Sequence, residues 1–216
     1  MSEGIQRSPI SRGPQTVFVV DDDVSVRESL EGLIATEGWQ PVVFASAQEF
    51  LSYPLCSAPS CLILDLSLPD INGLELQERL AVGGSELPII IITGHGDVPT
   101  TVRAMKAGAV EVLTKPFVDE DLLVAIRNSL TTSSAAIELK ARHRALEECY
   151  DSLSPREREV MGLVIQGHLN KTVGFQLGIS EITVKAHRGQ VMRKMKARSF
   201  AELVNIGAKL GLGQHN

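Results

Sequence analysis

Short apolar runs alternate with amphipathic stretches along the first 130 residues of the chain. The runs that favour β-strands are Thr16–Val20, Pro41–Phe44, Cys61–Asp65, Pro88–Ile92 and Val110–Leu113. The stretches with helical spacing are Val24–Glu37, Ala47–Ser52, Gly73–Leu80, Pro99–Lys106 and Asp119–Leu130. Five strand–helix repeats predict a parallel sheet with helices on both faces. The nearly continuous apolar runs also fit strands that are buried on both sides.

The pattern changes after Leu130, where only helices are predicted. Residues 131–151 favour a helical linker that extends the fifth helix. Ser154 and Glu157 form a capping-box pattern with proline at the first helical position, and Gly178 precedes a tight turn with Ser180 as the N-cap. The expected helices are Pro155–Ile165, Lys171–Leu177, Glu181–Lys196 and Phe200–Leu210. A helix, a short turn containing glycine and a second helix have the form of a helix-turn-helix.

These patterns divide the chain into four segments. We expect a flexible N-terminal tail over residues 1–15, an α/β domain over 16–130, a helical linker over 131–151 and an all-α domain over 152–216. Charge follows this division, because residues 1–130 hold 8 Lys and Arg against 18 Asp and Glu, whereas residues 131–216 hold 13 against 8. The basic half is suited to nucleic acid. Chance surface composition is the alternative explanation.

Composition restricts the class of protein. Hydrophobic residues make up 44% of the chain and charged residues 22%, as in ordinary globular proteins. No apolar run approaches the ~20 residues that span a bilayer, and residues 1–15 contain no apolar stretch typical of a secretion signal. The three cysteines lack metal-ligand spacing. We therefore expect a cytoplasmic protein without a membrane partner.

Polar residues lie at or just after the carboxyl ends of four of the predicted strands. Because ligands bind beyond the carboxyl ends of parallel strands, we expect these side chains to meet at one edge of the sheet. Clustered carboxylates need a compensating cation, and oxygen ligands suit Mg²⁺. A carboxylate there can act as the nucleophile that forms an aspartyl-phosphate, with the lysine stabilising charge on the phosphoryl group. The residues are Asp21, Asp22, Asp23, Asp65, Thr93 and Lys115.

Each of these residues also has a simpler explanation. Any of the three aspartates after the first strand is suited to capping the first helix. Lys115 would then be an ordinary surface lysine, and Thr93 part of the turn before Gly94. Their joint occurrence at strand ends favours the cation site.

Five runs of residues in the first half of the chain together form a specific pattern. They are Val17-Phe18-Val19-Val20-Asp21-Asp22-Asp23, Leu62-Ile63-Leu64-Asp65-Leu66-Ser67-Leu68-Pro69, Ile92-Thr93-Gly94-His95-Gly96-Asp97, Lys115-Pro116-Phe117 and Ala104-Met105-Lys106-Ala107-Gly108-Ala109. Through these runs the chain resembles the receiver domain of two-component response regulators over about residues 15–130. The resemblance implies a five-stranded parallel, doubly wound, flavodoxin-like sheet and phosphorylation of Asp65 by a sensor histidine kinase. It also implies that Asp21, Asp22, Asp65 and the main-chain oxygen of Ser67 hold Mg²⁺, that Lys115 pairs with the phosphoryl group, and that Thr93 moves to bond it.

One position departs from the receiver pattern. The family usually has Phe or Tyr three residues before the lysine, and this ring swings inward on activation, but here the position is Val112. A β-branched side chain has few rotamers and no ring to relocate. The signal is therefore expected to depend on the loop after Thr93, or on Phe117.

The predicted helix after Ser180 is strongly basic. Residues 180–198 hold six Lys and Arg against one acid, and we expect Ile182, Val191 and Met195 to bury on its opposite side. A solvated basic face, or a face for an acidic protein, is the alternative. Four runs mark this part of the chain: Leu153-Ser154-Pro155-Arg156-Glu157-Arg158-Glu159-Val160, Asn170-Lys171, Ile179-Ser180-Glu181-Ile182-Thr183-Val184-Lys185-Ala186-His187-Arg188 and Lys194-Met195. Through them it resembles the LuxR-type helix-turn-helix over residues 152–212.

The whole chain thus resembles FixJ-like transcriptional regulators. The resemblance implies that Lys185, His187 and Arg188 face DNA and that Lys171, Ser180 and Thr183 contact phosphates. We expect a regulator that dimerises on phosphorylation and binds promoter DNA, with RNA polymerase as a possible further partner.

Two other classes compete with a regulator. A phosphatase using Asp65 is disfavoured because Ser67 stands where such enzymes place a second carboxylate, and no phosphate-cradling Gly-Lys-Ser/Thr loop is present. A protein-interaction relay without a DNA role is disfavoured by the basic helix.

Overall fold

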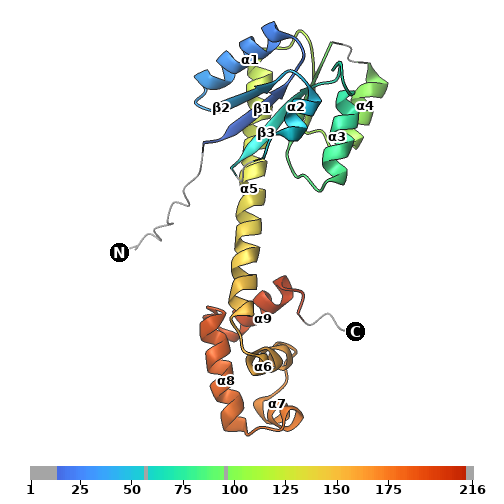
Figure 1. Ribbon diagram of the computed structural model, residues 1–216. Helices are drawn as coiled ribbons and strands as arrows, with labels where there is room; N and C mark the ends of the chain where they lie inside the picture. The colour runs from blue at the N-terminus through green and yellow to red at the C-terminus, as the bar shows by residue number, and fades with distance from the viewer. Residues whose placement is uncertain (1–13, 56–57, 95–96, 213–216) are drawn as a thin grey trace. The chain divides into compact units, whose positions relative to one another are not determined.

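The computed structural model describes residues 14–55, 58–94 and 97–212. The chain folds as two compact units that divide between Ile137 and Glu138 (Figure 1). This division lies inside the segment expected to be a linker. The expected N-terminal tail lies outside the described residues except for Pro14 and Gln15.

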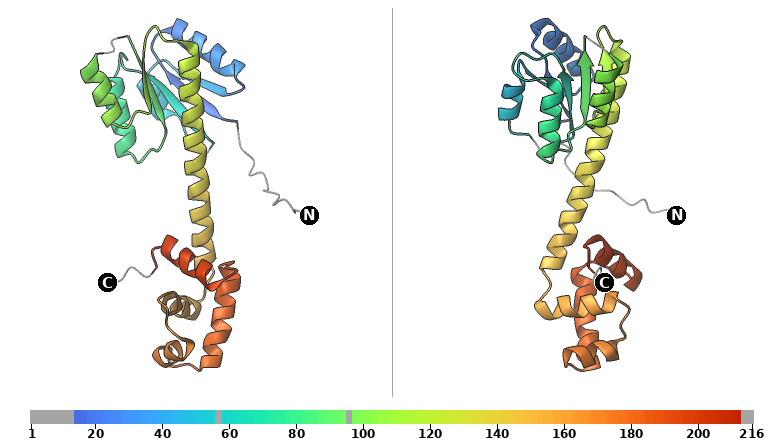
Figure 2. Two further views of the ribbon diagram at one scale, coloured as in Figure 1. Left: turned by 180° about the vertical axis from the view of Figure 1, so that it is seen from behind. Right: turned by 90° about the vertical axis from the view of Figure 1, so that its right-hand side faces the viewer.

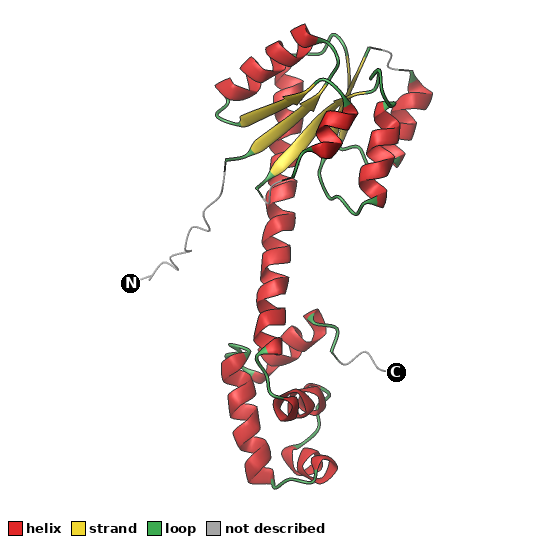
Figure 3. Ribbon diagram, viewed as in Figure 1, coloured by secondary structure: helices red, strands yellow, loops and turns green. Residues whose placement is uncertain are grey.

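The first unit contains a five-stranded parallel sheet in the order β2-β1-β3-β4-β5. Figure 3 draws its strands in yellow. The strands are β1 (Thr16–Val20), β2 (Gln40–Phe44), β3 (Ser60–Asp65), β4 (Ile89–Thr93) and β5 (Glu111–Thr114). The central strands β1, β3 and β4 are buried along their whole length, as their continuous apolar runs predict. The expected doubly wound α/β fold is confirmed.

Helices cover both faces of this sheet (Figure 2). They are α1 (Val24–Thr36), α2 (Ala47–Ser52), α3 (Gly73–Val82), α4 (Val98–Lys106) and α5 (Asp119–Asp151). Side chains of α1 and α5 pack in one apolar cluster with β1, β3 and β4, around residues such as Ile34, Ile63 and Ile126. Side chains of α2, α3 and α4 pack in a second cluster on the other face, around Phe18 and Phe50. These two clusters make the core that holds the strand ends in place.

Helix α5 is much longer than the stretch Asp119–Leu130 that periodicity predicts. It continues without a break to Asp151, so the expected linker segment is helical throughout. Ser133, beyond the predicted end, is buried, and its hydroxyl accepts a hydrogen bond from the Ser60 amide at 3.1 Å. No helix among the described residues combines the length and the apolar character that crossing a bilayer requires.

From Ser152 to Leu212, the second unit contains helices and the loops that join them. Its helices are α6 (Pro155–Ile165), α7 (Asn170–Leu177), α8 (Glu181–Lys194) and α9 (Phe200–Lys209). The predicted capping box at α6 is present: the Ser154 hydroxyl accepts from the Glu157 amide at 3.3 Å, and the Glu157 carboxylate accepts from the Ser154 amide at 2.7 Å. Ser180 caps α8 as predicted.

The buried face of α8 differs from the prediction at one position. Val191 and Met195 are buried as expected, but Ile182 is 79% exposed, so its predicted burial is wrong. Val184 takes the inward position instead. It lies seven residues before Val191, about two full turns, whereas nine residues separate Ile182 from Val191 and place it on the opposite side of the helix.

Candidate functional site

Parallel pairing brings the carboxyl ends of β1, β3, β4 and β5 to one edge of the sheet. Val20 pairs with Leu64 across β1 and β3, so Asp21 and Asp65 both stand directly at this edge. Strand β4 ends in Thr93, whose carbonyl accepts a hydrogen bond from the Lys115 amide at 2.8 Å. The pairing of the strands alone therefore brings positions 21, 65, 93 and 115 to the same edge of the sheet.

At this edge one ammonium group joins two buried carboxylates. The Lys115 Nζ atom lies 2.7 Å from Asp21 Oδ2 and 2.8 Å from Asp65 Oδ2. Asp21 is fully buried, Asp65 is nearly so, and Asp22 is exposed. Carboxylate oxygens of these three aspartates lie within 4.8 Å of one another. The structure thus places Asp21, Asp22, Asp65 and Lys115 in one cluster.

The electrostatics of the cluster reflect burial opposed by pairing. Burial raises the pKa of Asp21 above its usual value, although hydrogen bonds from Lys115 and the Asp23 amide act in the opposite direction. Burial acts to lower the pKa of Lys115, but its bonds to Asp21 and Asp65 outweigh that effect and hold the pKa above its usual value. Lys115 is therefore charged at neutral pH. It offsets one of the negative charges that meet at this edge.

The residues after β3 are held by hydrogen bonds that main-chain amides donate to carboxylate and carbonyl oxygens. The Ser67 amide donates to Asp65 Oδ1 at 3.1 Å, and the Gly73 amide donates to the Leu66 carbonyl at 3.1 Å. A Cβ atom at Gly73 would lie 2.4 Å from the Asp65 carbonyl oxygen, so this position admits only glycine without a shift. The Asp70 carboxylate accepts from the Gln48 amide at 2.9 Å and so ties the same loop to α2.

The alternative explanation for the first three aspartates holds for one of them. Asp23 is the N-cap of α1 and accepts hydrogen bonds from the amides of Ser25 and Val26. Asp21 does not cap the helix, because its carboxylate points to Lys115, while the Arg27 guanidinium donates to the Asp21 carbonyl at 2.6 Å. The surface-lysine explanation for Lys115 does not fit its two ion pairs.

The donor set of the cluster fits a small, hard cation. All candidate ligands are oxygens, which Mg²⁺ prefers, and Asp22 leaves one carboxylate open to solvent. Three carboxylates meet a single ammonium, so negative charge at this edge remains for a cation to neutralise. The cluster could therefore bind a divalent cation.

The remaining predicted residues of the first unit lie around this cluster. Thr93 is buried at the end of β4, and Val112 packs from β5 against the α2–α4 side of the core. Phe117 packs against the opposite cluster, with α1 and α5. His95 and Gly96 of the motif after β4 lie outside the described residues.

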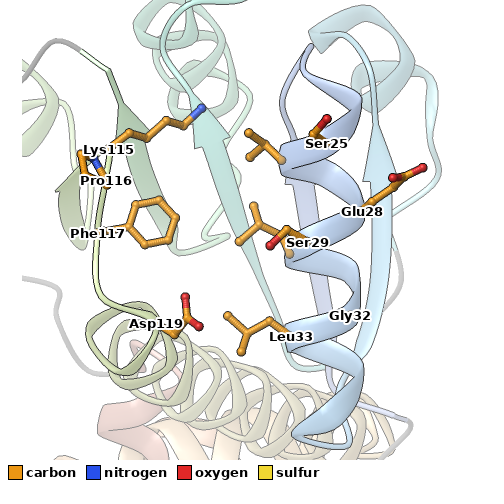
Figure 4. Close-up of a pocket in the computed structure, with 11 residues that line it drawn as sticks. Ser25, Glu28, Ser29, Gly32, Leu33, Lys115, Pro116, Phe117 and Asp119 are labelled. Atoms are coloured by element: carbon orange, nitrogen blue, oxygen red, sulfur yellow. The ribbon is translucent and has the colours of Figure 1, made fainter.

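An apolar hollow opens beside the cluster, between α1 and the segment that follows β5 (Figure 4). Lys115 and Phe117 line one side of it, and Ser29 and Leu33 of α1 line the other. Lys115 therefore borders both the buried carboxylates and this hollow.

In the second unit, α8 presents basic and polar side chains to solvent. Lys185 and Lys171 are exposed, and within the described part of the chain Lys185 pairs only with Glu181 one turn earlier, at 3.1 Å. The hydroxyls of Ser180 and Thr183 lie 2.8 Å apart at the start of α8. His187 is half-buried.

Two basic side chains of α8 form hydrogen bonds with other residues of the same unit. Lys194 Nζ lies 2.6 Å from Glu157 Oε2 and 3.0 Å from the Ser152 carbonyl oxygen. Arg188 donates to Asn170 Oδ1 at 2.6 Å. The basic count of the sequence did not reveal these contacts. Helical spacing from the buried valines would have indicated them, since Arg188 follows Val184 by four residues and Lys194 follows Val191 by three.

Comparison with known proteins agrees with this geometry. Residues 17–127 match the family described as response regulator receiver domain, and residues 151–206 match the bacterial regulatory proteins of the luxR family. The chain is 46% identical over 200 residues to Nodulation protein W of Bradyrhizobium diazoefficiens, covering 93% of this chain and 88% of that protein. It is 38% identical over 196 residues to the transcriptional regulatory protein FixJ of the same organism, covering 91% and 96%.

Solved structures give the same result. The response regulator StyR matches with a TM-score of 0.84 and 44% identity, over 91% of this chain and all of that one. Full-length FixJ from B. japonicum matches with a TM-score of 0.53 and 38% identity, over 91% and 97%. The family that joins these two domains consists of transcription regulators of two-component systems and not of enzymes. The chain therefore belongs to the response regulators that join a receiver domain to a LuxR-type DNA-binding domain.

Proposed function

We propose that Asp65 is the phosphoacceptor of this response regulator. A carboxylate oxygen of Asp65 attacks the phosphorus of a kinase phosphohistidine, a P–O bond forms, the P–N bond breaks, and the histidine nitrogen leaves with the bond's electron pair and takes up a proton. The observation that carries this assignment is the pairing of Lys115 with both Asp21 and Asp65 at the strand edge. The ammonium group is placed where it can stabilise charge on the phosphoryl group.

Asp21, Asp22 and Asp65 would hold Mg²⁺, together with the main-chain oxygen of Ser67. The ion would neutralise charge on the transferring phosphoryl group. Carboxylate oxygens of the three aspartates lie within 4.8 Å of one another, which supports this role. Thr93 stands at the end of the neighbouring strand, from which its hydroxyl can bond the phosphoryl group and move the segment before α4.

The test of the phosphoacceptor is Asp65→Asn. The variant should take up no phosphate from acetyl phosphate and Mg²⁺, as measured by intact mass, because an amide oxygen cannot replace the carboxylate nucleophile. Asp23→Asn is the matched control, since asparagine also caps a helix and Asp23 lies outside the Lys115 pairs; it should be phosphorylated like the wild type. Stable uptake of phosphate by the Asp65 variant would reject the assignment.

We infer that α8 binds promoter DNA through its exposed face. Lys185 is the central cationic contact, and Lys171, Ser180, Thr183 and His187 are the other proposed contacts. The exposed position of Lys185, paired with one acid on its own helix, supports this role. Lys185→Ala should weaken DNA binding and reduce the slope of log affinity against log salt by about 0.9, the value for one phosphate contact. Its phosphorylation should be unchanged, and equal DNA affinity for the variant and the wild type would exclude the contact.

We also propose that phosphorylation favours pairing of two receiver domains through α4. Val98, Val102 and Met105 form an exposed apolar stripe at helical spacing, while Ala104 is the only residue of α4 that is fully buried among those described. A second copy is the expected occupant, because identical apolar faces can bury each other. The molar mass of the wild-type protein in solution should double when a phosphodonor is added, whereas Asp65→Asn should stay monomeric.

RNA polymerase remains a proposed further partner of this regulator. The cytoplasm is its proposed location.

A further inference from the structure

Arg188 does not lie on the outward face of α8. It follows the buried Val184 by four residues and precedes the buried Val191 by three, so it shares their side of the helix. Ile182 and Gly189 lie on the opposite side, and both are exposed. A side chain on the core side of α8 reaches its own protein before it reaches a ligand beyond the outward face.

The contacts of Arg188 join three helices. Its Nη1 atom donates to Asn170 Oδ1, the first residue of α7, at 2.6 Å. Its guanidinium carbon lies 5.3 Å from the centroid of the Phe200 ring, the first residue of α9. A planar guanidinium group can bond in its plane while its face lies on a ring, and a lysine ammonium cannot reproduce this combination.

The start of α7 lacks a side-chain cap. Leu169 is its N-cap residue and supplies no side-chain hydrogen bond, unlike Ser154, Ser180 and Ser199 at the other helices of this unit. The middle of α7 packs closely against the turn that follows the helix, because a Cβ atom at Gly174 would lie 2.7 Å from the Ile179 carbonyl oxygen. Val173, in the first turn of α7, is buried in the same apolar cluster as Val184 of α8, and the bond from Arg188 to Asn170 adds a polar contact between the first residue of α7 and α8. Lys171 is the next residue.

We propose that Arg188 is a positioning residue for DNA binding, which fixes the start of α7 against α8 instead of contacting DNA itself. The inference rests on the proposed DNA-binding role of this unit. It assigns the affinity contribution of Arg188 to the placement of α7 and of the Lys171 side chain that α7 carries.

A double-mutant cycle in the full-length protein tests this role. Arg188→Met and Asn170→Ala should each weaken binding by about tenfold to a labelled duplex recovered by selection from genomic fragments, and the double variant should be no weaker than either single variant, because both remove one shared bond. Affinity is measured at a temperature at which circular dichroism shows every variant folded. A residue that only stabilises the fold would not change affinity under that condition.

Arg188→Lys separates positioning from a direct phosphate contact. Lysine keeps the charge and binds phosphate well, so a direct contact would retain most of the affinity, whereas positioning predicts a loss similar to that of Arg188→Met. If the methionine variant does not fold, Phe200→Leu removes the ring beneath the guanidinium group and should give a smaller loss in the same direction.

Two results would overturn the inference. The first is wild-type affinity for Asn170→Ala. The second is additive losses in the cycle together with near wild-type affinity for Arg188→Lys, which would make Arg188 a DNA contact. Lys185→Ala is the reference: if it also leaves affinity unchanged, the proposed DNA-binding face fails, whereas a loss there with no effect at Asn170 rejects only the positioning role.

Discussion

The receiver unit and the DNA-binding unit place their charged side chains in different ways. In the receiver, Asp21 and Asp65 meet because β1 and β3 are paired in register. Lys115, which directly follows β5, pairs with both carboxylates. On α8, basic side chains of one helix separate in space: Lys185 is exposed, while Lys194 bonds Glu157. Backbone geometry assembles the first site, whereas long flexible side chains with a choice of partners shape the second.

Among the substitutions that test this contrast, Gly73→Ala should have the largest effect on stability and on phosphorylation. If the backbone places Asp65, a methyl group that would lie 2.4 Å from its carbonyl oxygen must displace the loop. We expect the receiver to lose about 1–3 kcal/mol of stability. Phosphorylation should slow at least tenfold, since small errors in the position of a reacting group have large effects on rate. Urea unfolding followed by the fluorescence of Trp39, the single tryptophan, and uptake of phosphate from acetyl phosphate provide the two measurements.

Gly32→Ala is the control for this substitution. Gly32 lies inside α1 with no atom near its added Cβ, so alanine should stabilise the helix slightly and leave phosphorylation unchanged. Normal phosphorylation of Gly73→Ala would show that side chains, not the backbone, hold Asp65 in position.

The same contrast explains what the sequence could predict. The five strands and the convergence of Asp21, Asp65 and Lys115 were predictable, because parallel topology fixes where strand ends lie once the strands are recognised. The continuation of α5 to Asp151 was predicted only as a helical linker, since polar residues such as Thr131 carry little periodicity. The separate roles of the α8 basic residues were not predicted, because composition does not say which cation meets a carboxylate on another helix.

The next largest effect on stability should come from loss of the ion pair between Glu157 and Lys194. The hydrogen bond from Lys194, followed by that from the Ser154 amide, holds the pKa of Glu157 below its ordinary value of 4.5. A depressed carboxyl pKa means that ionised Glu157 stabilises the folded unit. This contribution is complete above pH 4.5 and is lost as the pH falls from there through the folded-state pKa.

Glu157→Gln should therefore destabilise the DNA-binding unit by about 1–2 kcal/mol at neutral pH, and by progressively less in acid. Urea unfolding of the full chain by circular dichroism, at neutral and acidic pH, measures the difference, with Trp39 fluorescence as an internal control for the receiver. If the variant and the wild type differed equally at both pH values, the ion pair would not be the source of the stability. Lys194 would then be available to bind DNA. The basic residues of α8 would in that case not be divided between DNA contacts and contacts within the protein.

The smallest change in stability is expected from a substitution of Lys196, a third basic residue of this region. Lys196 follows the end of α8 with a φ angle of 54°, in the left-handed region, and the next amide, that of Ala197, bonds the Met192 carbonyl at 3.0 Å. This is the helix-ending motif in which glycine normally occupies the left-handed position, because a Cβ atom is unfavourable there. Lys196→Gly should therefore stabilise the DNA-binding unit by about 0.5–1 kcal/mol, despite the greater freedom of glycine in the unfolded chain.

Thermal unfolding by circular dichroism measures this gain, and Lys196→Asn should give a smaller one because asparagine tolerates the same conformation. The glycine variant also removes a positive charge, so its DNA affinity reports separately on any contact. Unchanged affinity together with raised stability would mean that Lys196 carries strain without binding DNA. A loss of affinity beside the gain in stability would mean that the helix end is strained in order to present a cation, and the outward face of α8 would then extend past its last turn.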